Sequence, residues 1–489
     1  MIRVPPGPET DPDRRVPGLR CGAPRTSLYF RPDGLVASCC GSWHILGSVT
    51  GPDRRSLREI WDGHRRTLLR DAVDAGDDSL GCWECGRAVT EGRRDGSLAA
   101  VFDRYGSTDL GHPVLLDLAL SNRCNLECVM CNGGLSSTIR ARREGRPPLP
   151  SAYDDRFFDE LDEFLPHVRR LQFKGGEPFL APENRRIWDR LLELDLRPEV
   201  CVTTNGTVFN DEVARYVEEL GMELIVSVDA LDPERLRAIR VGVDPERLWA
   251  NVESFASITA RTGAKLELAM CLMSDNWSEL RGVLSEADRR GCAASVIWVD
   301  GPARFGLLRS TDVDLAAVAD SLDRTDASSP PLRGDLQLIW DDARDRIRSA
   351  ADGSPGPGSL EESPVRIAGR PGRSEVESVR RSLVEAAGSP EVAELRLDDD
   401  VVTAVSAPAW ADTLRLGEWV GHGLDEVMVL FGWASGAVVR ASIVPGEGGV
   451  HTARVHLTGD GGVSEVLTAY VPAPAGGATS WMLLARAGR

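Results

Sequence analysis

Residues 113–134, PVLLDLALSNRCNLECVMCNGG, join an apolar stretch directly to three cysteines. The apolar residues 113–120 predict a buried β-strand, and Cys124, Cys128 and Cys131 follow it. In α/β folds, ligands bind at the carboxyl ends of the strands, so these thiols stand where an active site is expected. Three thiolates on one loop favour an iron–sulfur cubane with one open iron. The alternative is a zinc site completed by a distant fourth ligand.

The sequence after this loop repeats a pattern of short apolar strands and amphipathic helices. Strands alternating with helices, several of them almost wholly apolar, predict a parallel sheet covered by helices. Six strands fall short of the eight that close a barrel, so the predicted class is α/β with a partial (β/α)6 TIM-like barrel. The other predicted strands are 169–173, 199–204, 223–229, 265–270 and 294–299, and the predicted helices are 155–165, 183–194, 210–220, 245–261 and 276–290, with more helix in 311–350.

Three more polar motifs follow the second, third and fourth strands. Glycines allow a ligand to approach the backbone closely, and a carboxylate accepts hydrogen bonds from an ammonium group. Each motif alone could be an ordinary turn, but four at the same edge of one sheet favour a single polar ligand site. The residues concerned are Gly175, Gly176, Glu177 and Pro178 in GGEP, Thr204 and Asn205 in TTNG, and Ser227, Asp229 and Arg240 in the segment that begins SVD and ends IR.

A second set of cysteines precedes the barrel, within residues 21–100. TSLYFRPDGLVASCC predicts a β-hairpin on a PDG turn, and residues 56–73 predict an amphipathic helix with Ser56 as its N-cap. Four thiolates would fully ligate either a second iron–sulfur cluster or a zinc ion. The candidate ligands are Cys21, Cys39 or Cys40, Cys82 and Cys85, with Cys39 preferred over its neighbour.

The composition narrows the class of protein. The chain has 489 residues and a net charge of −18, so several domains are expected and a nucleic-acid partner is disfavoured. No apolar run reaches the roughly 18 residues of a membrane span, and no secretory signal opens the sequence. We therefore expect a cytoplasmic protein with reduced cysteines and no membrane partner.

The ends of the chain differ from the barrel in composition. Residues 1–20 predict a disordered tail, and residues 351–389, rich in Pro, Gly and Ser, predict a linker after a barrel domain over 110–350. Residues 390–489 predict an α+β domain. Its order of a strand, small helices, a Gly turn and two closing strands resembles a PAS domain. An unrelated small α+β domain is the alternative.

The order of CNLECVMC, GGEP, TTNG and SVD with a later IR resembles the radical S-adenosylmethionine (SAM) superfamily across about 110–300. The pattern from CGAPR to CWEC resembles the SPASM or twitch modules found in one branch of this superfamily. The chain departs from the family in two respects. In most members that module follows the barrel, and much of the superfamily has an aromatic residue in place of Met130, near the adenine of S-adenosylmethionine.

The resemblance implies a [4Fe-4S] cluster on Cys124, Cys128 and Cys131 that binds S-adenosylmethionine through its open iron. The GGEP turn would hold the amino group of S-adenosylmethionine, and Ser227 and Arg240 would contact its ribose or carboxylate. The second cysteine set would hold an auxiliary [4Fe-4S] cluster. One electron, from a donor such as flavodoxin or ferredoxin, would cleave the sulfonium to give a 5′-deoxyadenosyl radical.

That radical would take a hydrogen atom from a peptide or a small natural product. Because an auxiliary cluster can accept an electron from a substrate radical, oxidation or cross-linking is favoured over isomerisation, with epimerisation also open. An iron–sulfur redox sensor or scaffold that signals through the PAS-like domain is the alternative function. A sensor needs no site for a sulfonium cosubstrate, so the GGEP turn favours the enzyme. RNA modification is disfavoured by the acidic charge.

Overall fold

The computed structural model describes residues 16–90, 92–106, 111–299, 303–308, 310 and 313–352, and the backbone of C-terminal strands within 392–486. The expected tail therefore lies mostly outside the described residues, as does the expected linker from residue 353 onward. Residues 16–20 differ from the prediction of disorder. Val16 N–H donates a 2.7 Å hydrogen bond to Gly76 O, and Leu19 is buried. This segment is packed against the N-terminal unit because its leucine contributes to the core.

The predicted barrel strands are confirmed. They run parallel and lie side by side in sequence order, with each strand paired to the next. In the part of the chain that the structure describes, the sheet stays open, so the barrel is partial. The strands are β4 (Leu115–Leu118), β5 (Arg170–Phe173), β6 (Glu199–Thr204), β7 (Glu223–Ser227), β8 (Leu266–Leu272) and β9 (Ala293–Trp298).

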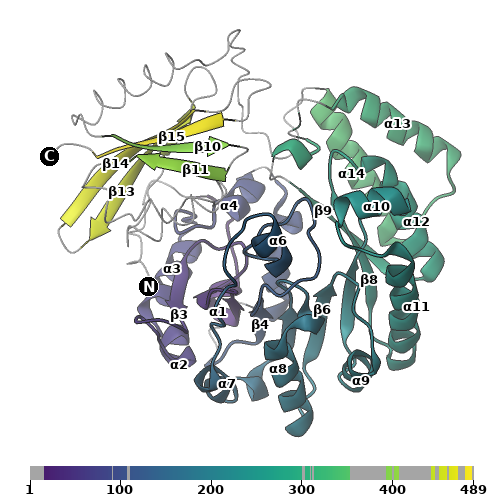
Figure 1. The fold of residues 1–489 in the computed structure, drawn as a ribbon, viewed down its shortest axis with the longest axis horizontal. Helices are drawn as coiled ribbons and strands as arrows, with labels where there is room; N and C mark the ends of the chain where they lie inside the picture. The colour runs from purple at the N-terminus through teal and green to yellow at the C-terminus, as the bar shows by residue number, and fades with distance from the viewer. Residues whose placement is uncertain are drawn as a thin grey trace.

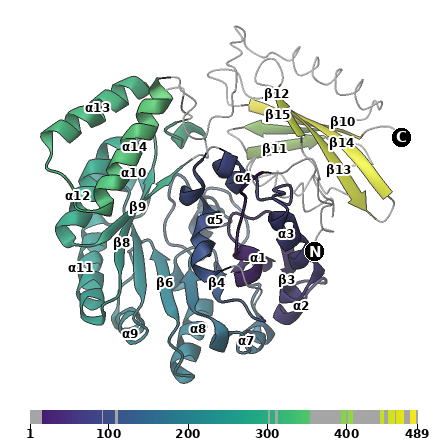
Figure 2. The ribbon, with the colours of Figure 1, turned by 180° about the vertical axis from the view of Figure 1, so that it is seen from behind.

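Helices cover the outer face of this sheet (Figures 1 and 2). Asn210 and Asp244 cap two of them by accepting hydrogen bonds from first-turn backbone N–H groups. The short helices α6 (Ser137–Arg142) and α10 (Pro233–Ile239) were not predicted. The remaining helices of this region are α7 (Asp155–Leu161), α8 (Pro182–Glu193), α9 (Asp211–Glu219), α11 (Pro245–Thr262), α12 (Leu280–Arg290), α13 (Leu315–Ser328) and α14 (Asp335–Ala351).

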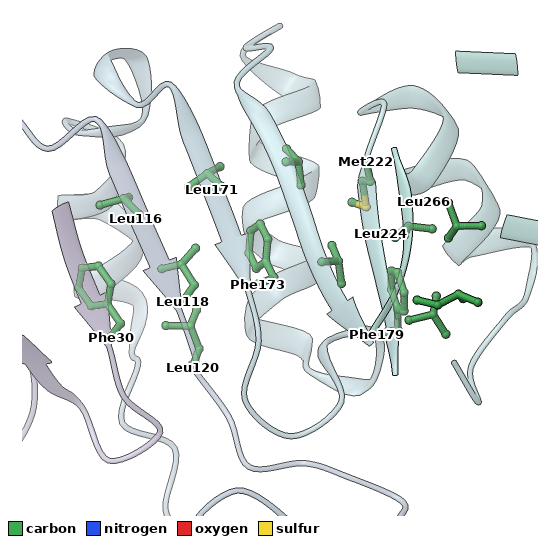
Figure 3. Close-up of a cluster of buried hydrophobic side chains, with 14 of the residues drawn as sticks. Phe30, Leu116, Leu118, Leu120, Leu171, Phe173, Phe179, Met222, Leu224 and Leu266 are labelled. Atoms are coloured by element: carbon green, nitrogen blue, oxygen red, sulfur yellow. The ribbon is translucent and has the colours of Figure 1, made fainter. Parts of the chain in front are cut away.

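The main hydrophobic core lies between the sheet and these helices (Figure 3). Leu116 and Leu118 of β4 and Phe173 of β5 belong to it. Because side chains alternate along a strand, Asp117 and Gln172, which pair in register, project to the opposite, inner face. Polar strand residues are therefore directed toward the interior of the partial barrel.

The N-terminal unit continues the same sheet. β1 (Ser27–Phe30) runs parallel to β4, and β2 (Leu35–Ala37) and β3 (Ile45–Ser48) follow it antiparallel. In the described residues the sheet thus has nine strands, in the order β3-β2-β1-β4-β5-β6-β7-β8-β9. The hairpin was predicted, but its pairing with the barrel was not.

The prediction of a single helix at residues 56–73 is wrong in one respect. The structure has α2 (Leu57–Trp61) and α3 (His64–Asp74), separated at Asp62 and Gly63. Gly63 is extended, and a Cβ there would lie 2.7 Å from Glu59 O, so the chain turns sharply at this glycine. The N-cap at Ser56 is confirmed, with a capping box to Glu59. Further short helices are α1 (Ala23–Thr26), α4 (Trp83–Thr90) and α5 (Leu98–Val101).

The described C-terminal strands form an antiparallel sheet in the order β11-β10-β15-β14-β13-β12. The structure has strands where the first and the closing strands were predicted, but the first is divided into two antiparallel strands, Val392–Asp398 and Val401–Ser406. The predicted small helices fall in residues 407–441, outside the described residues. Likeness to a PAS domain remains a prediction. No described helix is long and apolar enough to cross a membrane. The strands are β10 (Val392–Asp398), β11 (Val401–Ser406), β12 (Ser442–Pro445), β13 (His451–Gly459), β14 (Gly462–Val471) and β15 (Thr479–Arg486).

Candidate active site at the carboxyl ends of the strands

The three predicted cysteines lie together on the loop after β4. Cys124, Cys128 and Cys131 are all partly buried. They are close enough that a charge on Cys124 raises the pKa of both other thiols. The loop therefore brings three sulfur atoms to the carboxyl edge of the parallel sheet, as the sequence predicted.

Helix α6 and the residue after it hold this loop in place. The Thr138 hydroxyl donates a 2.6 Å hydrogen bond to Cys124 O. Arg143 donates from Nη2 to the carbonyl oxygens of Glu127 and Cys128, both at 2.8 Å. These hydrogen bonds satisfy backbone carbonyl groups that would otherwise need water as a donor. The conformation of the loop is therefore held by the protein itself.

The donor set fits a cluster. Burial raises the pKa of all three thiols, that of Cys131 to about 12. Iron binds the thiolate, so iron in a cluster would offset the cost of burying these charges. A cubane places one thiolate on each of three irons, so three cysteines on one loop fit such a cluster, whereas a structural zinc site needs a fourth ligand.

The GGEP turn after β5 packs against the entrance to the cysteine loop. Gly175 has φ +84°, a conformation that side chains disfavour. A Cβ on Gly176 would overlap Arg123 O, which also accepts a 2.6 Å hydrogen bond from Glu177 N–H. Both glycines are therefore required by close backbone approach. The buried Pro178 opens the short turn that follows.

Glu177 joins the GGEP turn to the TTNG turn. Its Oε1 accepts hydrogen bonds from Thr204 Oγ1 at 2.8 Å and Phe179 N–H at 3.1 Å, and its Oε2 accepts from Asn205 N–H at 2.7 Å. Burial raises the pKa of Glu177 to about 7, although these donors lower it. The carboxylate is thus fully enclosed and cross-links two strand ends. Its predicted contact with an ammonium group remains a prediction.

Asp229 and Arg240 form a buried ion pair, with Arg240 Nε 2.7 Å from Asp229 Oδ2. Asp229 Oδ1 accepts a 2.8 Å hydrogen bond from Cys271 N–H. The segment around Arg240 reaches the cysteine loop, because Val129 N–H donates to Ile239 O. The pair therefore fixes the backbone that supports the loop. Ser227, at the end of β7, is partly buried on the inner face of the sheet.

The second cysteine set lines one small cavity in the N-terminal unit. Cys21, Cys39, Cys82 and Cys85 all border it. Burial raises the pKa of each thiol, that of Cys21 to about 12. The other walls are largely apolar and include Leu19, Leu69, Val73, Leu98 and Phe102. Four sulfur atoms around an apolar cavity fit a fully ligated cluster.

The structure separates the neighbouring cysteines 39 and 40. Cys39 borders the cavity, whereas Cys40 does not and is exposed. Cys40 is instead near Lys174 and Tyr29, whose pKa values a Cys40 thiolate would raise. This placement supports Cys39 as the ligand.

Sequence reasoning missed the residues that support the site. Ser136 caps α6 and donates to Leu126 O at 2.7 Å, and the buried Asn276 donates to Asp229 O at 3.0 Å. The run SSTIR after the cysteine loop carried a helix-start signal that could have revealed the first. Lys174 lies directly before GGEP and was also passed over.

Comparisons with known proteins agree with this geometry. Residues 118–284 match the radical SAM superfamily, and residues 21–86 match the SPASM model, described as an iron–sulfur cluster-binding domain. The matched segments contain the first three cysteines and the four cavity-lining cysteines, respectively.

The chain is also similar to individual proteins. A GTP 3′,8-cyclase of Caulobacter vibrioides is 28% identical over 238 residues, covering 45% of this chain and 63% of the relative. One of Rhodopseudomonas palustris is 29% identical over 196 residues, covering 38% and 52%. The chain thus spans about half to three-fifths of these relatives.

Among solved structures, Streptococcus suis SuiB bound to precursor peptide SuiA has a TM-score of 0.33 and 15% identity, over 55% of this chain and 62% of that one. Native anSMEcpe with bound AdoMet has a TM-score of 0.32 and 19% identity, over 44% and 59%. A radical SAM domain takes a [4Fe-4S] cluster and S-adenosylmethionine, and a SPASM domain takes an auxiliary iron–sulfur cluster. In this chain the segment that matches the SPASM iron–sulfur domain precedes the segment that matches the radical SAM superfamily.

Proposed function

We propose that this protein is a radical SAM enzyme that takes a hydrogen atom from a peptide or a small natural product. The observation that carries the proposal is the gathering of three partly buried thiols beside the GGEP turn at the carboxyl edge of the sheet. Oxidation, cross-linking or epimerisation would follow, with an electron donor such as flavodoxin or ferredoxin in the cytoplasm.

Cys124, Cys128 and Cys131 would hold the SAM-binding cluster, and Cys21, Cys39, Cys82 and Cys85 the auxiliary one. When bound, the first cluster and S-adenosylmethionine supply reductive cleavage of the sulfonium and a hydrogen-abstracting radical. The protein's own residues position these groups. The close-packed glycines of GGEP would bring backbone near the cosubstrate. Glu177 is hydrogen-bonded to the TTNG turn and Arg240 is paired with Asp229, and these contacts would hold the turns around it.

A guanosine nucleotide is a second candidate substrate, because the curated relatives reported above are GTP 3′,8-cyclases. Near the GGEP turn, Lys174 is already paired with Asp117. This lysine would therefore contribute little net charge to holding a triphosphate, which needs cations that are not neutralised in this way.

Formation of 5′-deoxyadenosine tests the proposal. The full-length protein, reconstituted anaerobically with iron and sulfide, would receive S-adenosylmethionine and dithionite, and the nucleoside would be followed by mass spectrometry. We expect formation by the parent and background levels from a Cys124→Ala, Cys128→Ala, Cys131→Ala variant. A protein with both clusters that cleaves no cosubstrate, with or without peptides or GTP, would instead support the redox sensor or scaffold.

A further inference from the structure

Lysine is rare in this chain. Lys174 and Lys265 are the only lysines in the sequence, although lysine and arginine together number 57. Lys265 is a surface residue whose side chain is 82% exposed. Lys174, by contrast, lies at the end of β5 directly before GGEP, with a side chain 30% exposed. Its ammonium group is therefore partly buried beside the GGEP turn, in a protein whose basic side chains are almost all arginine.

Lys174 forms an ion pair with a buried aspartate. Lys174 Nζ lies 2.6 Å from Asp117 Oδ2, and the Asp117 side chain is only 8% exposed. Tyr29 pairs in register with Asp117, and its ring centroid lies 5.0 Å from Lys174 Nζ. Gln172 is the register partner of Asp117 on the other side. Three adjacent strands, β1, β4 and β5, thus each contribute one polar side chain to the inner face.

One atom of this cluster has no partner. Asp117 Oδ1 is buried and has no hydrogen-bond donor within the described residues. A buried acceptor without a donor costs free energy, so native proteins rarely leave one unused. The ammonium group has three N–H donors, and the Asp117 ion pair uses one direction. Asp117 Oδ1 can therefore accept a further hydrogen bond, and the neighbouring Lys174 Nζ can donate one.

The Asp117–Lys174 pair lies beside the GGEP turn and near the N-terminal unit. Lys174 directly precedes Gly175 and Gly176, which pack on the entrance to the Cys124 loop. On its other side, Lys174 is near enough to Cys40 of the N-terminal unit to be affected by its charge. A group held here would therefore lie beside the turn that packs on the Cys124 loop.

We propose that Asp117 and Lys174 form a substrate subsite that holds an amide group, with the amide N–H donating to Asp117 Oδ1 and the amide C=O accepting from Lys174 Nζ. This deepens the proposed function and rests on it. The pair is neutral overall, so it suits a neutral group that carries a donor beside an acceptor. A peptide bond has this pattern, and so does the lactam edge of guanine. A free anion or cation would leave one member of the pair opposed by like charge.

Lys174 acts as a hydrogen-bond donor here and not as a nucleophile. Burial lowers its pKa, but the nearby Asp117 charge outweighs that effect, and the pKa is raised overall. An ammonium ion carries no lone pair for attack on a carbonyl carbon. The same charge keeps its reaction with amine-directed reagents slow and sensitive to what covers it.

The test uses the full-length, cluster-loaded protein with S-adenosylmethionine and dithionite. The probes are a pool of N-acetylated, C-amidated synthetic hexapeptides and, separately, GTP. The first readout is the ratio of 5′-deoxyadenosine formation with the probe to that without it. The second is acetylation of Lys174 by a water-soluble N-hydroxysuccinimide ester, measured by mass spectrometry with exposed Lys265 as internal reference.

At least one probe should raise the rate ratio and slow acetylation of Lys174 but not of Lys265. Stimulation by peptides would identify a peptide amide, and stimulation by GTP the guanine lactam. Asp117→Asn and Lys174→Met should each lower the stimulated ratio by about tenfold or more, the effect of a lost charge-assisted hydrogen bond. Because a single change leaves a partly buried charge unpaired, the double variant Asp117→Asn, Lys174→Met keeps the site neutral and should show the same loss. Lys265→Met should keep the parent ratio.

Retention of the parent ratio by the double variant would overturn the proposal. So would a probe that raises the rate without protecting Lys174, or the failure of both probes to change either rate or acetylation. Failure of the proposed function is distinct, because it would appear as no 5′-deoxyadenosine from the parent under any condition. Protection of Lys174 can still be read in that case, since acetylation requires no turnover.

Discussion

The two cysteine sites are built in opposite ways. Around Cys124, Cys128 and Cys131, the supporting contacts are polar and come from a helix start and an arginine behind the loop. Around the second set, the walls are largely apolar side chains that surround the sulfur atoms. The first site is supported by hydrogen bonds from behind the loop, and the second by packed side chains. We call them the open and the closed site because three thiolates leave one iron of a cubane without a protein ligand and four leave none.

The difference matches the number of thiolates. Three thiolates leave one iron of a cubane without a protein ligand, and a cosubstrate needs access to that iron. Four thiolates leave no iron open, so apolar walls around them block no cosubstrate. Exclusion of water by such walls tunes the reduction potential of a redox centre. Under the proposed function, the open site would perform chemistry on a bound molecule, and the closed site would exchange electrons.

Removing ligands from the closed site should separate the two roles. We expect Cys82→Ser, Cys85→Ser to lower bound iron from about eight to about four atoms per chain, since each cubane holds four. It should still form 5′-deoxyadenosine with dithionite, unlike the triple alanine variant of the open site. Iron analysis and mass spectrometry give both values. Loss of cosubstrate cleavage in this variant at full occupancy of the first cluster would contradict the assignment of roles.

Variants of the adjacent Cys39 and Cys40 test the ligands of the closed site more finely. Cys39→Ser should lose about four iron atoms per chain, because Cys39 borders the closed cavity. Cys40→Ser should keep them, since Cys40 is exposed and outside that cavity. Iron content and the visible absorption of the reconstituted variants measure the difference. Equal losses in both variants would mean that the two residues share ligation.

The open site should also depend on the buried ion pair between Asp229 and Arg240. Arg240→Met leaves Asp229 buried without its cation and should lower the free energy of unfolding by about 3–5 kcal/mol. Arg261→Met removes a half-exposed pair with Glu218 and should cost less than about 1 kcal/mol. Denaturant unfolding of the two variants makes the comparison. Similar costs would show that Arg240 does not support the loop through Asp229.

Glu177 should give the open site a pH dependence. Its pKa is about 7 in the folded protein against 4.5 for the free group, so the unfolded chain ionises first as pH rises. The stabilising contribution is complete below pH 4.5 and is lost as pH rises through 7, by roughly 3 kcal/mol in total. Between pH 4.5 and 8 the parent should therefore lose that much free energy of unfolding relative to the Glu177→Gln variant, which has no carboxyl group to ionise. Urea midpoints at several pH values test this, and a constant difference would count against it.

Much of the barrel could be predicted from the sequence because its signals are local. Strand runs such as residues 199–204 and cap residues such as Asn210 act on their immediate neighbours. The turn glycines were also readable, although the reason for Gly176, its approach to Arg123 O, required the structure. The same holds for Cys39 against Cys40, since a one-residue choice depends on which side chain faces the cavity.

Long-range pairing could not be predicted. β1 and β4 are far apart in sequence, and no local pattern records that they lie parallel. The pairing of Asp117 with Lys174 depends on the register of β4 and β5, which alternation alone does not fix. The break at Gly63 was missed because the apolar period continues across it, while the backbone at that glycine is extended.

The parallel pairing of β1 with β4 has a practical consequence for dissecting the protein. Deleting everything before residue 111 would strip one side of β4 and expose a row of unpaired backbone N–H and C=O groups. Such a shortened chain would be prone to edge-to-edge association, however complete its own cysteine loop. Aggregation of the isolated radical SAM domain would then result from a missing neighbouring strand and not from a missing cluster. The N-terminal unit therefore protects the edge of the barrel sheet from association with other chains.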